Sequence, residues 1–183
     1  MNTRTTDITT KRLLLRPFRD ADEDAIIANL NDKRITATTS HIPYPYTRND
    51  ARAWLDLCRS RLDGAEHDNY AIDLEGELIG SVGLDYNREH RRAEVGYWIS
   101  VGHWNRGIAT EALRAAIDRA FGRDDCDRVF AHHYVGNEAS GRVMEKIGMR
   151  REGVLRAHMR KDGDAKDCVC YGLLKQEWLA LLG

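Results

Sequence analysis

The stretch Glu94–Phe121 reads EVGYWISVGHWNRGIATEALRAAIDRAF, and its hydrophobic pattern changes in the middle. The residues Ala93–Val101 fit a β-strand, whereas small and apolar residues recur at helical spacing over Ala109–Phe121. The residues between them, WNRGIA, form a short loop that leads directly into the helix. This part of the chain therefore predicts a strand, a tight loop and a helix in immediate succession.

The start of this helix is a candidate anion site. The first backbone N–H groups of a helix have no partner inside the helix, and the helix dipole makes this end positive. An anion such as a diphosphate is therefore expected there. Gly107 would let the backbone approach closely, Ala109 keeps the next turn small, and Arg106 adds a positive charge. A glycine in such a turn is also common without any ligand, so the spacing alone leaves both interpretations open.

The glycine pattern excludes two nucleotide-binding classes. It lacks the complete GxGxxG signature of dinucleotide-binding proteins and the GxxxxGK[ST] signature of P-loop proteins. Neither a Rossmann-type NAD enzyme nor a P-loop nucleotide hydrolase is indicated.

The N-terminal half predicts one strand, two helices and an antiparallel group of strands. A strand over Arg12–Arg16 ends before Pro17, and Asp20 is expected to cap a helix that runs to about Asn31. An irregular loop over Thr36–Thr47 and a helix from Asn49 or Asp50 to about Leu62 are expected next. They are followed by a hairpin of Tyr70–Leu74 and Leu78–Tyr86, with its turn at Glu75–Gly76, and by the strand Ala93–Val101.

The C-terminal half alternates strands and helices. A strand over Arg128–Val135 precedes a helix over Ala139–Ile147, and MRREGVL and KDCVCYGLL read as two later strands. The alternation requires some parallel pairing and the hairpin requires antiparallel pairing, so the sheet is expected to be mixed. Two strands that each lead into a helix start bring both helix N-termini to one end of the sheet, where a ligand is expected.

Composition narrows the class of protein. A length of 183 residues suits a single domain over residues 1–183. The 28 basic and 29 acidic side chains nearly cancel, which disfavours a dedicated nucleic-acid binder. The four cysteines form no CxxC pair and have no histidine at zinc-ligand spacing, so no metal site is expected. With a polar N-terminus and no long apolar run, we expect a cytoplasmic protein without a membrane partner.

Five motifs occur in order along nearly the whole chain: RLLLRPFRDAD, AEVGYWI, NEASGRVMEKIGM, EGVLR and KDGDAKDCVCYGLLKQEW. They resemble the GNAT superfamily of N-acetyltransferases, in particular its RimJ/RimL-type branch, which acetylates ribosomal-protein N-termini. The superfamily signature Q/R-x-x-G-x-G/A falls on Trp104, Gly107 and Ala109, with Trp104 in place of Gln or Arg, a departure that this branch commonly shows. The resemblance implies an α/β (α+β) GNAT fold: a mixed, mostly antiparallel sheet of about six or seven strands with a splayed parallel pair, flanked by about four helices.

The resemblance also implies acetyl-CoA as a cosubstrate, with no metal. Its diphosphate would lie on the backbone amides of Arg106–Thr110, and its pantetheine arm would run between the strands Glu94–Val101 and Arg128–Val135. The cofactor-binding residues implied in this way are Trp98, Ile99, Ser100, Val101, Trp104, Arg106, Gly107, Ile108, Ala109, Thr110, Asn137 and Ser140. For Asn137, a plain helix cap is the alternative.

The implied reaction is direct attack of a neutral amine on the thioester in a ternary complex. It needs a base for the ammonium, a polarised carbonyl and an acid for the leaving thiolate. Glu94 occupies the strand position of a catalytic glutamate in several family members and is the candidate base, either directly or through water. An ion pair of Glu94 with Arg91 or Arg92 is the structural alternative.

The acid is less clearly indicated. Much of the superfamily uses a tyrosine at the position that Met144 occupies here, and a thioether cannot donate a proton. Ser140 is the replacement that the RimL-like branch suggests, and Tyr134 is a weaker alternative. A helix-start serine that bonds to the backbone is the structural reading of Ser140.

The acceptor is expected to be a primary amine, either a protein α-amino group or a small molecule. The candidate acceptor-binding residues are His41, Tyr44, Tyr46 and Trp54, with core packing as the alternative for Trp54. Of the strand neighbours His132 and His133, only one is expected to face the cleft. Because the family tyrosine is missing, a non-catalytic acetyl-CoA sensor is the alternative function. Homodimer formation is left open.

Overall fold

The computed structural model describes residues 6–61 and 66–183, and its central element is one mixed sheet with the strand order β1-β2-β3-β4-β5-β6-β8-β7. The strands are β1 (Ile8–Thr9), β2 (Leu14–Arg16), β3 (His67–Leu74), β4 (Glu77–Asn87), β5 (Arg92–Ile99), β6 (Arg128–Tyr134), β7 (Arg150–Lys161) and β8 (Asp164–Leu174). The helices are α1 (Glu23–Leu30), α2 (Lys33–Thr36), α3 (Arg48–Arg61), α4 (Ile108–Phe121), α5 (Glu138–Lys146) and α6 (Lys175–Leu182). Two 3₁₀ turns, Asp20–Asp22 and Val101–His103, precede α1 and α4.

The expected mixed sheet is confirmed, because β5 and β6 pair in parallel and every other neighbouring pair is antiparallel. The described residues contain eight strands and six α-helices, which exceeds the expected six or seven strands and about four helices. The additional elements are the strand β1, the four-residue helix α2 and the eight-residue C-terminal helix α6. β1 has two residues and α2 has four, so neither is long enough to produce a recognisable hydrophobic period. Leu62, the expected end of the second helix, lies outside the described residues.

The first helix begins later than predicted, because Asp22 has another role. The bidentate guanidinium of Arg16 donates to both carboxylate oxygens of Asp22 at 2.9 Å, and its Nε donates to Asp73 at 2.9 Å. Asp22 also accepts the backbone N–H of Arg19. This buried cluster fixes a 3₁₀ turn at Asp20–Asp22, and α1 starts only at Glu23.

The hairpin turn between β3 and β4 forms where it was predicted. Glu75 and Gly76 have φ angles of 55° and 89°, the left-handed conformation at both central positions that a two-residue hairpin favours. The carboxylate of Asp73 accepts the N–H of Gly76 at 2.7 Å and fastens the turn.

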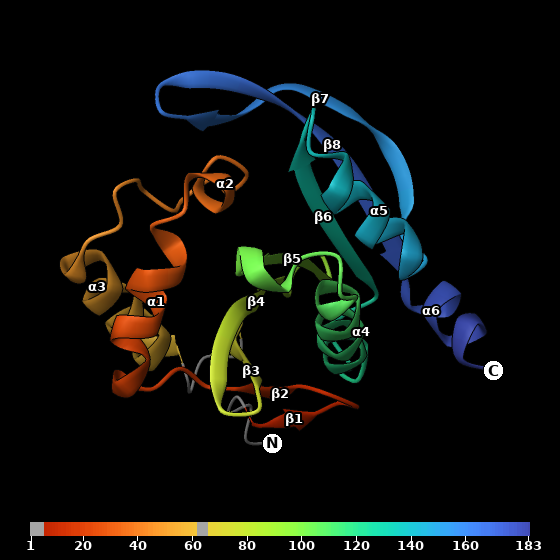
Figure 1. Ribbon diagram of the computed structural model, residues 1–183. Helices are drawn as coiled ribbons and strands as arrows, with labels where there is room; N and C mark the ends of the chain where they lie inside the picture. Colours follow the sequence, from red (N-terminus) through yellow and green to blue (C-terminus); the bar gives the residue numbers. More distant parts are fainter. Residues whose placement is uncertain (1–5, 62–65) are drawn as a thin grey trace.

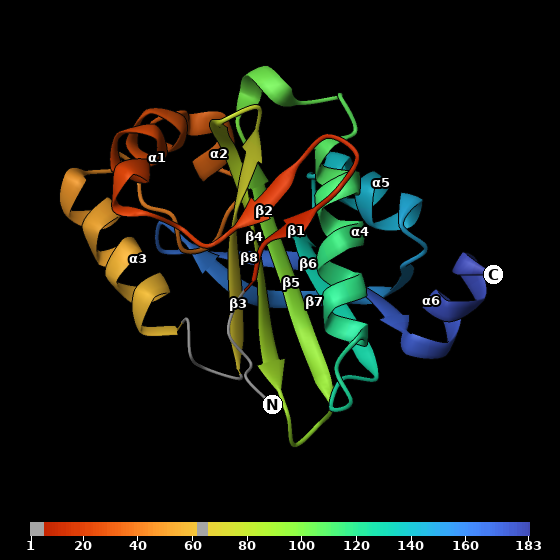
Figure 2. The ribbon, with the colours of Figure 1, turned by 90° about the horizontal axis from the view of Figure 1, so that it is seen from below.

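Helices cover the two faces of the sheet separately. Figures 1 and 2 show α1 and α3 on one side of the central strands and α4 on the other. Successive side chains of β5 accordingly belong to different cores: Val95 and Ile99 are buried with α4, whereas Trp98 packs with α1 and α3. The strand β5 therefore presents one set of side chains to each face.

The long β7–β8 hairpin reaches across the molecule toward α2 (Figure 1). Near its tip, Lys161 Nζ donates to the Ile42 carbonyl at 2.7 Å, and the Met159 sulfur lies 3.4 Å from Ser40 Oγ. The hairpin is irregular between Leu155 and Met159, where Ala157 has a φ of 51°. The register shift marks a bulge, which bends a strand locally.

Two further observations bear on ligands and location. Within residues 6–61 and 66–183, no helix is long and apolar enough to cross a membrane. In the same ranges, no group of three or more His, Cys, Asp or Glu side chains is arranged to hold a metal ion.

Candidate active site

The start of α4 has its N–H groups exposed. Gly107 is the residue before the helix and adopts a left-handed conformation, with φ 75° and ψ 6°. No side chain of the described residues caps this end. Arg106 and Gly107 are exposed, and Ile108 begins the helix with a buried side chain. The helix start therefore presents unpaired donors beside a glycine that lets a ligand approach, as an anion site requires.

Hydrogen bonds connect the N-terminal segment to the loop before α4 and to the first turn of this helix. Glu111, in the first turn of α4, accepts bonds from the Thr10 hydroxyl at 2.7 Å, the Arg12 N–H at 2.8 Å and the Arg12 guanidinium at 2.7 Å. The same guanidinium donates to the Arg106 carbonyl at 2.9 Å. Burial alone would raise the pKa of Glu111, but the bonds from Thr10 and Arg12 outweigh it and lower the pKa. These contacts connect the N-terminal segment to the loop and to the first turn of α4.

The strands β5 and β6 separate next to this helix start. Their pairing is limited to three positions at the N-terminal end, from Arg92 opposite Arg128 to Glu94 opposite Phe130. Further along, the Ser100 N–H donates to Ile79 on β4, so Ile99 directs its own polar groups to the opposite edge. The indole N–H of Trp104 donates to the Ile99 carbonyl at 2.8 Å on that edge. Beyond Glu94 and Phe130, β5 and β6 no longer pair.

A second helix begins at the same end of the sheet. The helix α5 follows the carboxyl end of β6, just as α4 follows β5, with Asn137 at the residue before its start. Asn137 was expected to be either a plain helix cap or a ligand contact. Its side chain makes no capping bond to α5, and it therefore remains available to a ligand.

The candidate acid Ser140 is bonded to a tyrosine rather than to the backbone. Its Oγ lies 2.9 Å from the hydroxyl of Tyr97, which comes from β5. Burial raises the pKa of Tyr97, and the bond from Ser140 offsets part of this rise. Met144 is 1% exposed and belongs to the core. A buried methionine thus stands at the position where much of the family has its acidic tyrosine. Tyr134 is also buried, and its hydroxyl has no partner in the part of the chain that the structure describes.

The candidate base Glu94 faces a histidine. Its carboxylate lies 3.3 Å from Nδ1 of His132, and the Glu94 side chain is 41% exposed while that of His132 is 8% exposed. The ring of His158 contacts that of His132 with centroids 5.0 Å apart. Glu94 thus has one exposed side toward the cleft and one side held by His132.

The arginines near Glu94 are engaged elsewhere. Arg91 donates to Asp127, and the guanidinium of Arg92 lies over the ring of Phe130 at 5.3 Å. The ion pair that was the structural alternative for Glu94 therefore does not form in the structure. His133 points away from Glu94, with its Nδ1 2.8 Å from the Tyr134 carbonyl, so one histidine of the pair faces the cleft, as the alternation predicts.

The candidate acceptor residues divide into two groups. Tyr44 is 48% exposed with Lys33 Nζ 5.0 Å from its ring centroid, and His41 is exposed in the same loop. Tyr46 is 7% exposed and belongs to the core under α1 and α3. Trp54 packs edge-on against Phe18 in that core. His41 and Tyr44 are thus exposed, while Tyr46 and Trp54 pack in the core.

Sequence reasoning missed one side chain at this site, Tyr97. Tyr97 is three residues from Glu94, so the two side chains lie on opposite faces of β5. The alternation that pairs Glu94 with its neighbours therefore does not indicate Tyr97. The ring of His158 contacts that of His132 from the irregular part of β7, and no sequence pattern predicts this contact.

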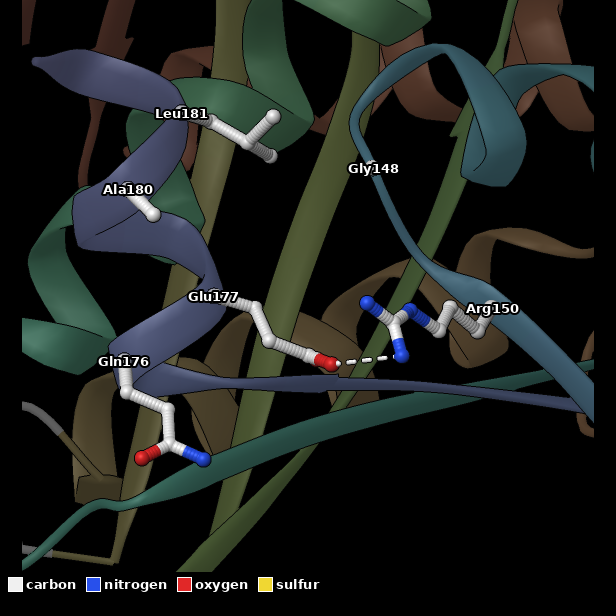
Figure 3. Close-up of a pocket in the computed structure, with 6 residues that line it drawn as sticks. All are labelled: Gly148, Arg150, Gln176, Glu177, Ala180 and Leu181. Carbon is white, nitrogen blue, oxygen red and sulfur yellow. Dashed lines mark ion pairs between the residues drawn. The ribbon is translucent and has the colours of Figure 1, made fainter.

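A hollow elsewhere on the surface lacks comparable chemistry. It measures about 500 Å³ and lies between α6 and the start of β7, lined by Gly148, Arg150, Gln176, Glu177, Ala180 and Leu181 (Figure 3). Its two charged side chains, Arg150 and Glu177, neutralise each other at 3.1 Å. The opening between β5 and β6, not this hollow, carries the candidate catalytic groups.

Comparisons with known proteins identify the family of this chain. A family model described as an acetyltransferase (GNAT) domain matches residues 12–150. The uncharacterized N-acetyltransferase YnaD of Bacillus subtilis (strain 168) is 34% identical over 173 residues, which is 93% of this chain and 98% of that protein. The chain belongs to the GNAT acetyltransferase family, as the five motifs predicted, and it is an acetyltransferase enzyme.

Solved structures extend the likeness to the whole fold. The GNAT-family acetyltransferase from Bacillus anthracis is 27% identical, covers 93% of this chain and 99% of its own, and has a TM-score of 0.81. RimL, a ribosomal L7/L12 α-N-protein acetyltransferase solved in complex with coenzyme A, covers 92% of this chain and 98% of its own with a TM-score of 0.84. Its identity is 19%, so this second likeness concerns the fold alone.

Proposed function

We propose that this enzyme transfers the acetyl group of acetyl-CoA to a primary amine by direct attack in a ternary complex. One observation carries the proposal: the strands β5 and β6 open immediately beside the uncapped start of α4. An anion site and a gap for an extended chain, side by side, match the two parts of coenzyme A. Bound acetyl-CoA supplies an activated acyl group as a thioester.

The diphosphate would lie on the N–H groups around Gly107–Thr110, with Arg106 as an added cation. The pantetheine arm would pass through the opening and bond to the free edge of β5 near Ile99. Asn137, whose side chain makes no capping bond, would contact an amide of the arm. Backbone donors do most of this work, which is compatible with a net charge of only −1.

Glu94 is the proposed base. The amine forms a bond to the carbonyl carbon while Glu94, directly or through a water, takes its proton. His132 stabilises the carboxylate at 3.3 Å and keeps it aimed at the opening. A glutamate that is 41% exposed is accessible to a substrate and also exchanges its proton with solvent.

Ser140 is the proposed acid. When the carbon–sulfur bond breaks, its electron pair stays on sulfur, and the Ser140 hydroxyl gives that sulfur a proton. Ser140 lies in the first turn of α5, on the α4 and α5 side of the opening, opposite Glu94. Base and acid on opposite sides of the carbonyl suit the removal of one proton and the delivery of another.

The proposed acceptor is the α-amino group of a protein or a small amine. RimL is named for the first class, and the spermidine N(1)-acetyltransferase of Escherichia coli (strain K12), 25% identical over 126 residues or 68% of each chain, is named for the second. The acceptor would enter beside His41 and Tyr44, between the 36–47 loop and the β7–β8 hairpin. All four cysteines are free thiols, which supports a reducing compartment such as the cytoplasm.

The test follows free thiol from acetyl-CoA in the presence of peptides with free N-termini and a panel of small amines. Glu94→Gln and Ser140→Ala are each expected to lower turnover about 10²-fold or more while coenzyme A affinity stays largely intact. Glu77→Gln removes an exposed carboxylate at the start of β4 and serves as the matched control.

Two outcomes would contradict the proposal. Tight coenzyme A binding with no thiol release across the whole panel would support the alternative, a non-catalytic sensor. An acetylated protein detected by mass spectrometry before the amine is added would replace direct attack with a covalent intermediate.

A further inference from the structure

The serine proposed as acid has a hydroxyl partner from another element. Ser140 Oγ and Tyr97 Oη are 2.9 Å apart, although the two residues are 43 positions apart in the chain. Tyr97 comes from β5 and Ser140 from α5, so the bond spans the opening at its α4 and α5 side. A serine that needed only to be held in place could have bonded to the backbone of its own helix turn.

The two hydroxyls differ in how readily they give up a proton. A phenol has an ordinary pKa of about 10 and a thiol of about 8.5, so a phenol is chemically close to the leaving thiolate. An aliphatic hydroxyl is a far weaker acid than either, and it serves better as a relay, since it can accept one proton while donating another. The pair therefore contains a proton source and a relay.

We propose that Tyr97 supplies the proton for the leaving thiolate and passes it through Ser140. This inference rests on the proposed function and specifies how its acid step works. Sulfur takes the electron pair of the broken bond and the proton of Ser140, and the Ser140 oxygen takes the phenolic proton of Tyr97. The resulting phenolate recovers a proton from water, which also receives the proton that Glu94 removed from the amine.

The surroundings of Tyr97 keep the phenol neutral until it is needed. Its side chain packs against the main core, and burial raises its pKa, so it carries its proton at neutral pH. No charged group of the described residues contributes to this shift. Charged or titratable side chains on the elements around it include Glu111, Arg114, Glu138, Arg142 and His133. Of these, Glu111 is held by Arg12 and His133 bonds to a backbone carbonyl.

The geometry also separates this role from that of Tyr134. Tyr134 is an even number of residues from His132 on β6, so both face the side of Glu94. Its hydroxyl has no partner within the described chain, whereas Tyr97 is already joined to Ser140. Tyr97 is therefore the tyrosine connected to the proposed acid.

The experiment compares the wild-type protein with Tyr97→Phe, using coenzyme A release with an amine that the wild type acetylates. The variant should lose about 10²-fold in kcat, with an unchanged KM for acetyl-CoA. With p-nitrophenyl acetate as acyl donor, whose leaving group needs no proton, the loss should shrink below tenfold. Tyr70→Phe removes a buried phenol hydroxyl from β3 and should leave both reactions unchanged.

A second variant distinguishes a proton source from a merely structural hydroxyl. Incorporation of 3,5-difluorotyrosine at position 97 keeps the hydroxyl but lowers its pKa. The basic limb of the kcat–pH profile should move to lower pH in this protein and disappear in Tyr97→Phe. An unmoved limb, or equal losses with both acyl donors, would overturn the role of Tyr97. If the wild type itself transfers acetyl to no amine, the proposed function fails instead.

Discussion

Replacing Gly107 by alanine should weaken coenzyme A binding through the backbone rather than through a clash. Gly107 has a φ of 75°, where a side chain costs about 1–2 kcal/mol. The added Cβ would lie 3.5 Å from Arg12 Nη2, an ordinary contact distance, so the methyl group itself fits. At about 1.4 kcal/mol per factor of ten, the strain corresponds to a factor of about 5 to 30 in the population of the native loop.

The strain can appear in either of two measurements. If the loop relaxes, the N–H groups of α4 lose their alignment and coenzyme A affinity falls by that factor. If Arg12 holds the loop through the Arg106 carbonyl, affinity is kept and the free energy of unfolding falls by about 1–2 kcal/mol. Because the Arg12 side chain is 40% exposed and its contacts are correspondingly weak, we expect most of the effect in affinity.

Isothermal titration, which needs no acceptor, measures the affinity for coenzyme A. Urea unfolding of the same samples measures the free energy of unfolding. Gly102→Ala lies in the same connection but has open space around its Cβ, and it should change neither quantity. Gly107→Asn should recover much of the affinity, since asparagine tolerates the left-handed conformation. If Gly107→Ala has wild-type affinity and wild-type stability, the anion site does not depend on this conformation and the reasoning is refuted.

Three other predictions concern the contacts that support the site. Arg16→Met leaves two buried carboxylates without their partner and should cost about 3–5 kcal/mol in urea unfolding; an unchanged midpoint would contradict the buried cluster. Glu111→Gln should lower stability at neutral pH. Because the folded pKa of Glu111 is lowered, the difference should be full above about pH 4.3 and vanish as pH falls through the folded pKa; a difference independent of pH in urea titrations would count against the charged contact. Lys161→Met breaks the bond to the Ile42 carbonyl and should raise KM for the amine, with KM for acetyl-CoA unchanged. If only KM for acetyl-CoA changes, the β7–β8 hairpin lies outside the acceptor site.

The sequence by itself determined the family and predicted a helix start preceded by glycine. WNRGIAT already specified a glycine before a helix start, and the structure places the left-handed Gly107 at that position. The Glu75–Gly76 turn and the mixed sheet were also predictable, because turn residues and hydrophobic periods are local properties of the chain. Short elements such as β1 and α2 were not, since two to four residues produce no period.

Only the tertiary structure decided which side chains meet. Glu94 was ambiguous between an arginine pair and a catalytic role until β5 and β6 came together and gave it His132 as a neighbour. Ser140 was ambiguous until α5 folded back onto β5 and joined it to Tyr97. Such pairs join residues about forty positions apart, and their distances depend on strand register and on the point where two strands separate. The sequence alone contains neither strand register nor the point of separation, so the neighbours of the proposed reacting groups are decided only when the sheet is assembled.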